Sequence, residues 1–222
     1  MINILLIGAP GSGKGTAAAC LQSELGICHF STGDALRAEI KSGSELGQFA
    51  AGFMASGRLL PDEKMLQLVA GRLGCLEADC RGLVYDGFPR TLSQAEALDR
   101  MLAGRGSRVH GALLLDVEEE ILHRRLTARR VCPGCGAIYN VISRPPRREG
   151  VCDQCGGALV QRPDDTLETA KRRIAVYEHE TLPVIAHYER LGVLLKVAPG
   201  SELSNVMPAI RSWMQGLLVR QA

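Results

Sequence analysis

The chain has 222 residues, of which 46% are hydrophobic and 23% are charged, and its formal net charge is +2. These are ordinary values for a globular protein, and the length suits one α/β domain with room for small inserts. So small a net charge argues neither for nor against nucleic-acid binding. No run of the sequence approaches the ~20 consecutive apolar residues that a membrane-spanning helix needs.

The N-terminal stretch Met1–Ile7 runs directly into a glycine-rich loop. It lacks the basic start and the small-residue cleavage site of a signal peptide. We therefore expect the protein in the cytoplasm, where thiols are kept reduced.

Strands and helices alternate along the first half of the chain. Residues 2–7 form a short apolar run bounded by glycine, which is typical of a buried parallel strand. The pattern of apolar residues and breakers then predicts a helix over 14–25, a helical stretch from Ser31 to Gly57, a helix over 61–73, a strand over 83–86, a helix over 93–102 and a strand over 111–116.

The second half contains a segment of different character. A helix is predicted over 118–130, with acidic residues first and basic residues last, the order that suits its dipole. Residues 131–165 are rich in cysteine, proline and glycine, which indicates turns and short hairpins. A helix over 166–190, a strand over 193–197 and a helix from about Leu203 follow, so the chain is predicted to form a doubly wound parallel sheet.

The first motif that carries chemistry is the loop Gly-Ala-Pro-Gly-Ser-Gly-Lys-Gly-Thr between the first strand and the first helix. Its glycines let several backbone N–H groups turn towards one anion, and its lysine adds a positive charge near the β and γ phosphates. The alternative is a glycine-rich turn with an exposed lysine, which the strand–loop–helix context disfavours. The residues expected to bind a nucleoside triphosphate are Gly11, Ser12, Gly13, Lys14, Gly15 and Thr16.

One departure from the usual motif concerns magnesium. A Ser or Thr that contacts Mg²⁺ usually follows the lysine directly, but here Gly15 stands there and Thr16 comes next. Water-mediated Mg²⁺ binding with help from Asp86, at the end of the second predicted strand, fits better. Asp86 could equally be a helix N-cap or a turn residue.

The sequence also offers material for a second phosphate site, which a simple ATPase does not need. Ser-Thr-Gly-Asp at 31–34 is followed by Arg37, and Asp-Gly-Phe-Pro-Arg at 86–90 stands at a strand end, where ligands of open α/β sheets bind. An arginine offers a bidentate fork to phosphate oxygens. Arg37 alone is more typical of a surface residue, whereas the position of Arg90 favours a phosphate ligand.

Four of the eight cysteines form two C-x-x-C pairs separated by sixteen residues. Cys132, Cys135, Cys152 and Cys155 match a zinc-ribbon pattern, in which four thiolates close a tetrahedral structural site. Two disulfides are the alternative, which a reducing compartment disfavours. The remaining cysteines, 20, 28, 75 and 80, are expected to be small buried apolar residues.

The three strings at 8–16, 31–37 and 86–91, in this order and spacing, resemble the adenylate kinases. Arg-Arg-Val-Cys-Pro-Gly-Cys-Gly at 129–136 extends the resemblance to the longer, zinc-bearing bacterial type, and it covers essentially the whole chain. The resemblance implies a P-loop NTPase-type α/β fold with a core of residues 1–30, 61–127 and 166–222, a nucleoside-monophosphate-binding helical insert of residues 31–60, and a zinc-ribbon-like lid of residues 128–165.

The activity implied by the resemblance is reversible phosphoryl transfer from MgATP to AMP, giving two ADP, in a monomer with structural Zn²⁺ and no nucleic-acid or membrane partner. One alternative is a related kinase with GTP as donor or another monophosphate as acceptor. Another is a zinc-ribbon nucleic-acid module that carries a nucleotide switch. The arginine runs near 124–130 and 144–148 motivate that idea, and an aromatic content of 4% argues against it.

The resemblance also implies residue roles. AMP would be bound by Thr32, Arg37, the backbone of Arg58, Leu59 and Leu60, the turn Gly87, Phe88, Pro89 and Arg90, and Gln94, which would read the adenine. ATP would contact Arg129, Ile138, Tyr139 and Ser201, and Arg162 and Arg173 would clamp phosphates; paired aspartates 164 and 165 would anchor the lid. Tyr139 could instead pack within the ribbon. Arg125 precedes Arg129 by four residues, which would place both on one helix face.

The expected chemistry needs no general base, because the acceptor is a phosphate oxygen already ionised at neutral pH. Alignment and charge neutralisation should suffice. The groups expected to supply the charge, together with Mg²⁺, are Lys14, Arg90, Arg125, Arg129, Arg162 and Arg173. The five histidines are scattered along the sequence and form no catalytic pattern.

Overall fold

The computed structural model describes residues 1–75, 80, 82–198, 200 and 202–219. A five-stranded parallel sheet lies at its centre, in the order β2-β3-β1-β4-β7. The strands are β1 (Ile2–Ile7), β2 (Cys28–Ser31), β3 (Gly82–Asp86), β4 (Gly111–Leu115) and β7 (Leu194–Val197). The predicted α/β class and parallel sheet are therefore confirmed.

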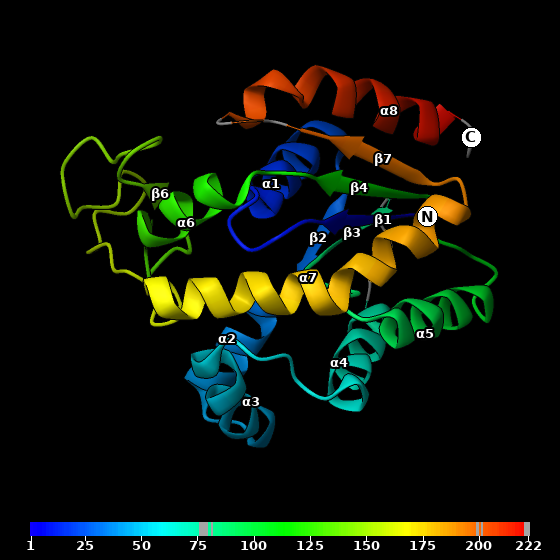
Figure 1. Cartoon of the computed structure of the whole chain (residues 1–222), viewed down its shortest axis with the longest axis horizontal. Helices are drawn as coiled ribbons and strands as arrows, with labels where there is room; N and C mark the ends of the chain where they lie inside the picture. Colours follow the sequence, from blue (N-terminus) through cyan, green and yellow to red (C-terminus); the bar gives the residue numbers. More distant parts are fainter. Residues whose placement is uncertain (76–79, 81, 199, 201, 220–222) are drawn as a thin grey trace.

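Helices cover both faces of the sheet, as Figure 1 shows. Ile2, Ile4 and Leu6 of β1 pack against α1 (Lys14–Leu25) and α8 (Met207–Val219). Leu5 and Ile7 point to the opposite face, which is covered by α4 (Asp62–Gly74), α5 (Leu92–Ala103) and α7 (Leu167–Arg190). Successive side chains of a strand point to opposite faces, so a strand buried on both sides is a continuous apolar run.

The register of the sheet brings three loops together at one edge. Asp86 at the end of β3 lies beside Leu6 of β1 and beside Ser31 of β2. Because all these strands are parallel, the segments that leave them start side by side. The glycine-rich loop, the start of the insert and the Gly87–Arg90 turn therefore meet at the carboxyl edge.

β2 was not predicted, and the insert that follows it differs from the prediction. The insert holds two helices, α2 (Thr32–Ser42) and α3 (Glu45–Ser56), where one stretch was expected. Gly43 is left-handed with φ 72°, and the Ser44 hydroxyl accepts a hydrogen bond from the Gly47 N–H. A Cβ on Gly47 would lie 2.1 Å from the Glu39 carbonyl oxygen, so this glycine permits the two helices to approach closely.

The lid is a small irregular unit at one end of the molecule, beside α6 (Glu119–Thr127) (Figure 1). Its two short strands, β5 (Arg129–Val131) and β6 (Ile138–Asn140), form an antiparallel pair. The helix predicted to continue to residue 130 ends at Thr127 because the next residues pair with β6 instead. The prediction that Arg125 and Arg129 share a helix face was therefore wrong.

The expectation for the four cysteines outside the ribbon was also wrong for three of them. Cys28 and Cys80 form a disulfide, with their Cα atoms 5.9 Å apart. Parallel pairing places Cys28 beside Leu83, close to the start of β3, and this brings the two thiols together. Cys75 is exposed and Cys20 is half-buried.

Candidate functional site

A cavity of about 780 Å³ lies at the carboxyl edge of the sheet, between the glycine-rich loop, α2, the lid and α7. It is lined by most of the predicted site residues: Gly11, Gly13, Lys14, Gly15, Thr16, Arg37, Leu59, Gly87, Pro89, Arg90, Arg125, Arg129, Ile138, Tyr139, Arg162 and Arg173. Residues that are distant in the sequence therefore line the same cavity.

Six other predicted residues, all within the described part of the chain, do not line this cavity. Ser12, Thr32, Leu60, Phe88 and Gln94 are buried, and Arg58 is exposed with its guanidinium over the Phe53 ring. Ser201 lies outside the described residues.

The glycine-rich loop presents the start of α1 to the cavity. Gly13, the residue before the helix, is left-handed with φ 101°, a conformation that L side chains rarely adopt. No side chain caps the first turn of α1, so its N–H groups are available to an anion. The local geometry is that of a phosphate cradle.

Lys14 lies inside this loop with its ammonium group held by backbone. Nζ donates to the carbonyl oxygens of Gly8 at 2.7 Å and Ala9 at 2.9 Å. Burial lowers the pKa of Lys14 to about 8, although the nearby Asp86 carboxylate opposes the shift. The neighbouring arginines contribute to the same lowering, because nearby positive charges disfavour the protonated form.

The arginines are half-buried cations that line the same cavity. Burial and then the Arg173 charge lower the pKa of Arg90 to about 10. Burial and then the Arg129 charge lower the pKa of Arg162 to about 10. Among the described residues, Arg162 Nε and Ser12 Oγ are buried without a hydrogen-bond partner. Such a group of desolvated cations suits a polyphosphate, whose oxygens would relieve the repulsion.

Two consecutive aspartates, Asp164 and Asp165, hold the guanidinium groups of Arg173 and Arg129 in place. Asp165, whose side chain is fully buried, accepts a hydrogen bond of 2.7 Å from Arg129 Nε and a second one from Nη2. Asp164 accepts a bond of 2.8 Å from Arg173 Nη1. The fork on Asp165 fixes the direction of the Arg129 guanidinium, and the Nη1 contacts with Asp164 and Asp165 hold that of Arg173.

The lid and the insert meet across the cavity. Arg162 Nη2 of the lid lies 3.6 Å from Asp34 Oδ1 at the start of α2, and Asp34 also pairs with Arg37 at 2.6 Å. The lid and the insert therefore flank the cavity and contact each other through Asp34.

Asp86 faces the loop at the point where a Mg²⁺-phosphate group would lie. A Cβ on Gly15 would be 3.7 Å from Asp86 Oδ2, so the carboxylate directly adjoins this loop. Burial raises the pKa of Asp86, but the adjacent His29 and the charge of Lys14 outweigh it and the pKa is lowered. His29 Nε2 lies 3.4 Å from Asp86 Oδ2. Sequence reasoning missed His29 because the short strand β2, which carries it, was not predicted.

Gln94 and Thr32 brace the Gly87–Arg90 turn. Gln94 Oε1 accepts from the Arg90 backbone N–H at 2.8 Å, and its Nε2 donates to Asp62 Oδ1 at 2.7 Å. Thr32 Oγ1 donates to the Gly87 carbonyl oxygen at 2.9 Å. Adenine reading by Gln94 stays a prediction, since its polar atoms are engaged in the turn here.

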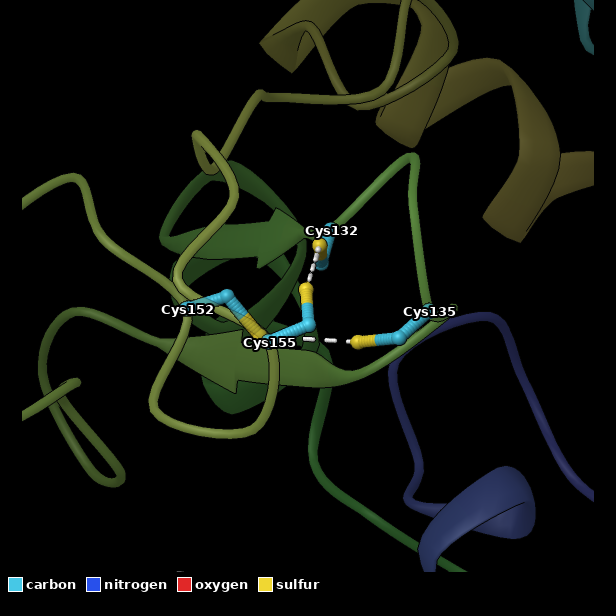
Figure 2. A group of neighbouring side chains, drawn as sticks. All are labelled: Cys132, Cys135, Cys152 and Cys155. Atoms are coloured by element: carbon cyan, nitrogen blue, oxygen red, sulfur yellow. Dashed lines mark hydrogen bonds between the residues drawn. The ribbon is translucent and has the colours of Figure 1, made fainter.

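Four cysteines of the lid converge on one point, as Figure 2 shows. The ligand atoms of Cys132, Cys135, Cys152 and Cys155 all lie within 4.8 Å of one another. The Sγ–Sγ distances are 3.4 Å for Cys132–Cys155 and 3.5 Å for Cys135–Cys152. Four sulfurs at ~2.3 Å from a tetrahedral zinc would be about 3.8 Å apart. All four are thiols, so the alternative of two disulfides in the ribbon was wrong, and the donor set fits Zn²⁺.

Tyr139 lies between the cysteines and the cavity. Its side chain is 6% exposed and packs with Cys132 and Cys152. Its hydroxyl accepts a hydrogen bond of 2.8 Å from the Asp153 backbone N–H. Packing within the ribbon, the alternative to an adenine contact, is therefore present, and the residue also lines the cavity.

Comparison with known proteins finds similarity to one family. The adenylate kinase family model matches residues 6–193. An adenylate kinase of Clostridium tetani is 46% identical over 94% of this chain and 100% of the relative. Adenylate kinases of Caldicellulosiruptor saccharolyticus (44% identical, 92% of this chain and 94% of the relative) and Carboxydothermus hydrogenoformans (44%, 96% and 100%) are similar as well. A search of the described residues finds no helix with the length and apolar character of a membrane span.

Proposed function

Because the chain belongs to the adenylate kinase family, we propose that it catalyses reversible transfer of the terminal phosphoryl group of MgATP to AMP, giving two ADP. The observation that supports this most is a single cavity with a phosphate cradle at Lys14 and a second cationic site at Arg90. ATP would bind on the side of the glycine-rich loop and lid, and AMP on the side of the insert.

Catalysis would depend on position and charge. The N–H groups at the start of α1 and Lys14 hold the β and γ phosphates of the donor, and Arg90 holds the acceptor phosphate. Arg129 and Arg173, oriented by Asp165 and Asp164, face the transferred group and neutralise the charge that spreads over its oxygens. Arg162 would add charge from the lid and Arg125 from α6, beside the glycine-rich loop.

Magnesium would be held through water by Asp86, and Thr16 lines the same cavity. When bound, the ion neutralises charge on the β and γ phosphates. Asp86 suits this role because its pKa is held below the usual range, so it remains a carboxylate.

Zinc would be held by Cys132, Cys135, Cys152 and Cys155 as a structural ion with no open position. The lid has few buried apolar residues, so a metal would replace the core that so small a unit lacks. The contact between Arg162 and Asp34 would help the lid exclude water, which otherwise competes for the phosphoryl group. We further propose that the enzyme acts as a cytoplasmic monomer, in which the Cys28–Cys80 disulfide is an exception to the reduced state that is usual there.

The test is a coupled assay of ATP against AMP, GMP, CMP and UMP, repeated with GTP as donor, together with metal analysis of the purified protein. We expect turnover with ATP and AMP well above the other pairs and about one zinc per chain. Preference for another monophosphate would show that AMP is not the acceptor. Absence of zinc, with four titratable lid thiols, would remove the metal assignment while leaving the kinase assignment intact.

A further inference from the structure

The phenol group of Tyr139 has a contact that the phosphoryl-transfer chemistry does not use. Tyr139 belongs to β6 and pairs with Arg130 of β5. Its ring packs on the cysteine cluster and its strand lines the cavity together with Ile138. One residue therefore connects the four thiols to the wall of the nucleotide site.

The hydrogen bonds of its hydroxyl group have a defined direction. The Asp153 backbone N–H donates to the oxygen at 2.8 Å, and Cys152 Sγ lies 3.6 Å from the same oxygen, which is within reach of a bond to the larger sulfur atom. The oxygen already accepts from Asp153, and a buried hydroxyl hydrogen needs an acceptor of its own. When Cys152 is a thiolate, its sulfur can only accept, so the hydroxyl hydrogen points to Cys152 Sγ.

We propose that Tyr139 is a positioning residue of the lid metal centre, whose hydroxyl donates a hydrogen bond to the Cys152 thiolate and ties the cluster to β6. The inference rests on the proposed zinc site. Both contacts hold the same loop, because Asp153 directly follows Cys152. Hydrogen bonds to ligand atoms orient the ligand and stabilise its charged form, and their loss typically weakens metal binding by about 10- to 100-fold.

Replacement of Tyr139 by Phe tests this, since the variant keeps the ring and removes only the hydroxyl. Zinc affinity is measured by competition with a chromogenic chelator, and the thiolate-to-metal charge-transfer band is recorded after loading with Co²⁺. We expect Tyr139→Phe to bind zinc about 10-fold more weakly and to shift the Co²⁺ band, since the sulfur loses a hydrogen bond. Wild-type affinity with an unchanged band would overturn the inference.

Tyr188→Phe is the matched control. The Tyr188 hydroxyl is buried in α7 and lies 3.4 Å from Asp99 Oδ1, outside the lid. This variant removes the same group from the same residue type, so we expect wild-type zinc affinity and an unchanged Co²⁺ band. An equal loss of zinc affinity in both variants would show a general effect on folding and overturn the role of Tyr139.

A second measurement keeps the test decisive if Tyr139→Phe does not fold. Fluorinated tyrosine, incorporated at all four tyrosines of the wild-type sequence, makes the hydroxyl a stronger donor. We expect slower zinc loss to the chelator and a shifted Co²⁺ band, and unchanged values would contradict the inference. Wild-type protein that takes up neither zinc nor cobalt would instead defeat the proposed zinc site itself.

Discussion

Arg90 is held at the carboxyl edge of the sheet by short contacts around its own turn. Its Nε donates to the Gly87 carbonyl oxygen at 2.8 Å, and its own carbonyl oxygen accepts from Thr181 Oγ1 at 2.9 Å. Burial disfavours its charge, as its lowered pKa indicates. Such a cation is poorly placed to stabilise the fold and well placed to bind an anion.

We therefore expect Arg90→Ala to lose turnover while remaining folded. Removing one charge contact to the transferred or acceptor phosphate should cost on the order of 3 kcal/mol of barrier, or about 10²-fold in kcat. Thermal unfolding should change little. The coupled assay and a melting curve check both, with Arg100→Ala on α5 as the control; near-wild-type turnover would remove Arg90 from the mechanism.

Lys14 predicts a pH dependence of donor binding. Its pKa in the ligand-free protein is lowered to about 8 by burial, whereas bound phosphates would favour the charged form and raise it. ATP binding should therefore weaken as pH rises above about 8, because the neutral Lys14 amine must then take up a proton before it can pair with the phosphates. Calorimetry at pH 7 and pH 9 should show proton uptake only at the higher pH, and an affinity independent of pH across this range would contradict the assignment.

The effect of pH on folding stability through Lys14 has the opposite sign to that of a lysine in a stabilising ion pair. The pKa of Lys14 is lower in the folded than in the unfolded chain, so the unfolded chain binds more protons between about pH 8 and 10. The penalty of burying the charge is present below pH 8 and is relieved as pH rises. Lys14→Met should remove this contribution.

At the scale of elements, the lid depends on its cysteines more than on apolar burial. Its buried cluster consists of Cys132, Tyr139 and Cys152. Chelation of zinc should lower the melting temperature and loosen the lid, because the four cysteines then no longer share one ion. The glycine-rich loop belongs to β1 and α1, so nucleotide affinity of that site should remain mostly intact.

Scanning calorimetry and ATP titration, before and after chelator treatment, check this prediction. The restored protein after zinc addition is the control for irreversible damage. An equal loss of ATP affinity and of melting temperature would show that the lid and the loop do not behave as separate elements.

The Cys28–Cys80 disulfide joins the unpredicted strand β2 to the start of β3 across 52 residues of sequence. A loop of this length should stabilise the fold by up to about 4 kcal/mol through the entropy of the unfolded chain, which corresponds to a shift of roughly 10 °C. The Cys28→Ser/Cys80→Ser double variant should therefore melt at a lower temperature.

Thiol titration gives an independent check of the same bond. Denatured, metal-free protein should show six thiols from its eight cysteines. Cys75→Ser, at an exposed position, is the control and should melt as the wild type does. Eight thiols in protein purified without reductant would contradict the pairing.

For the whole molecule, the proposal requires two nucleotides in one cavity. Arg162 of the lid and Asp34 of the insert approach each other across it, so this contact joins the two segments that flank the cavity. A mimic in which a polyphosphate joins two adenosines should therefore bind once per chain and compete with both ATP and AMP. Calorimetry that showed room for one nucleotide only, with no such competition, would contradict the proposal.

Much of this architecture follows from local patterns in the sequence. The apolar run at 2–7, the glycine loop before α1 and the C-x-x-C pairs each depend on neighbouring residues, and the structure has them where they were expected. The domain boundaries remain predictions.

Other features were decided only by tertiary pairing. β2 has four residues, Cys-His-Phe-Ser, whose composition carries no strand signal, and it forms because β3 offers it an unpaired edge. The end of α6 before Arg129, the disulfide and the approach of His29 to Asp86 all depend on partners distant in the sequence. The sequence by itself therefore determined the strands, loops and ligand sets that neighbouring residues encode. Which side chains lie opposite one another was decided by the register of the folded sheet, because that register depends on contacts between distant segments.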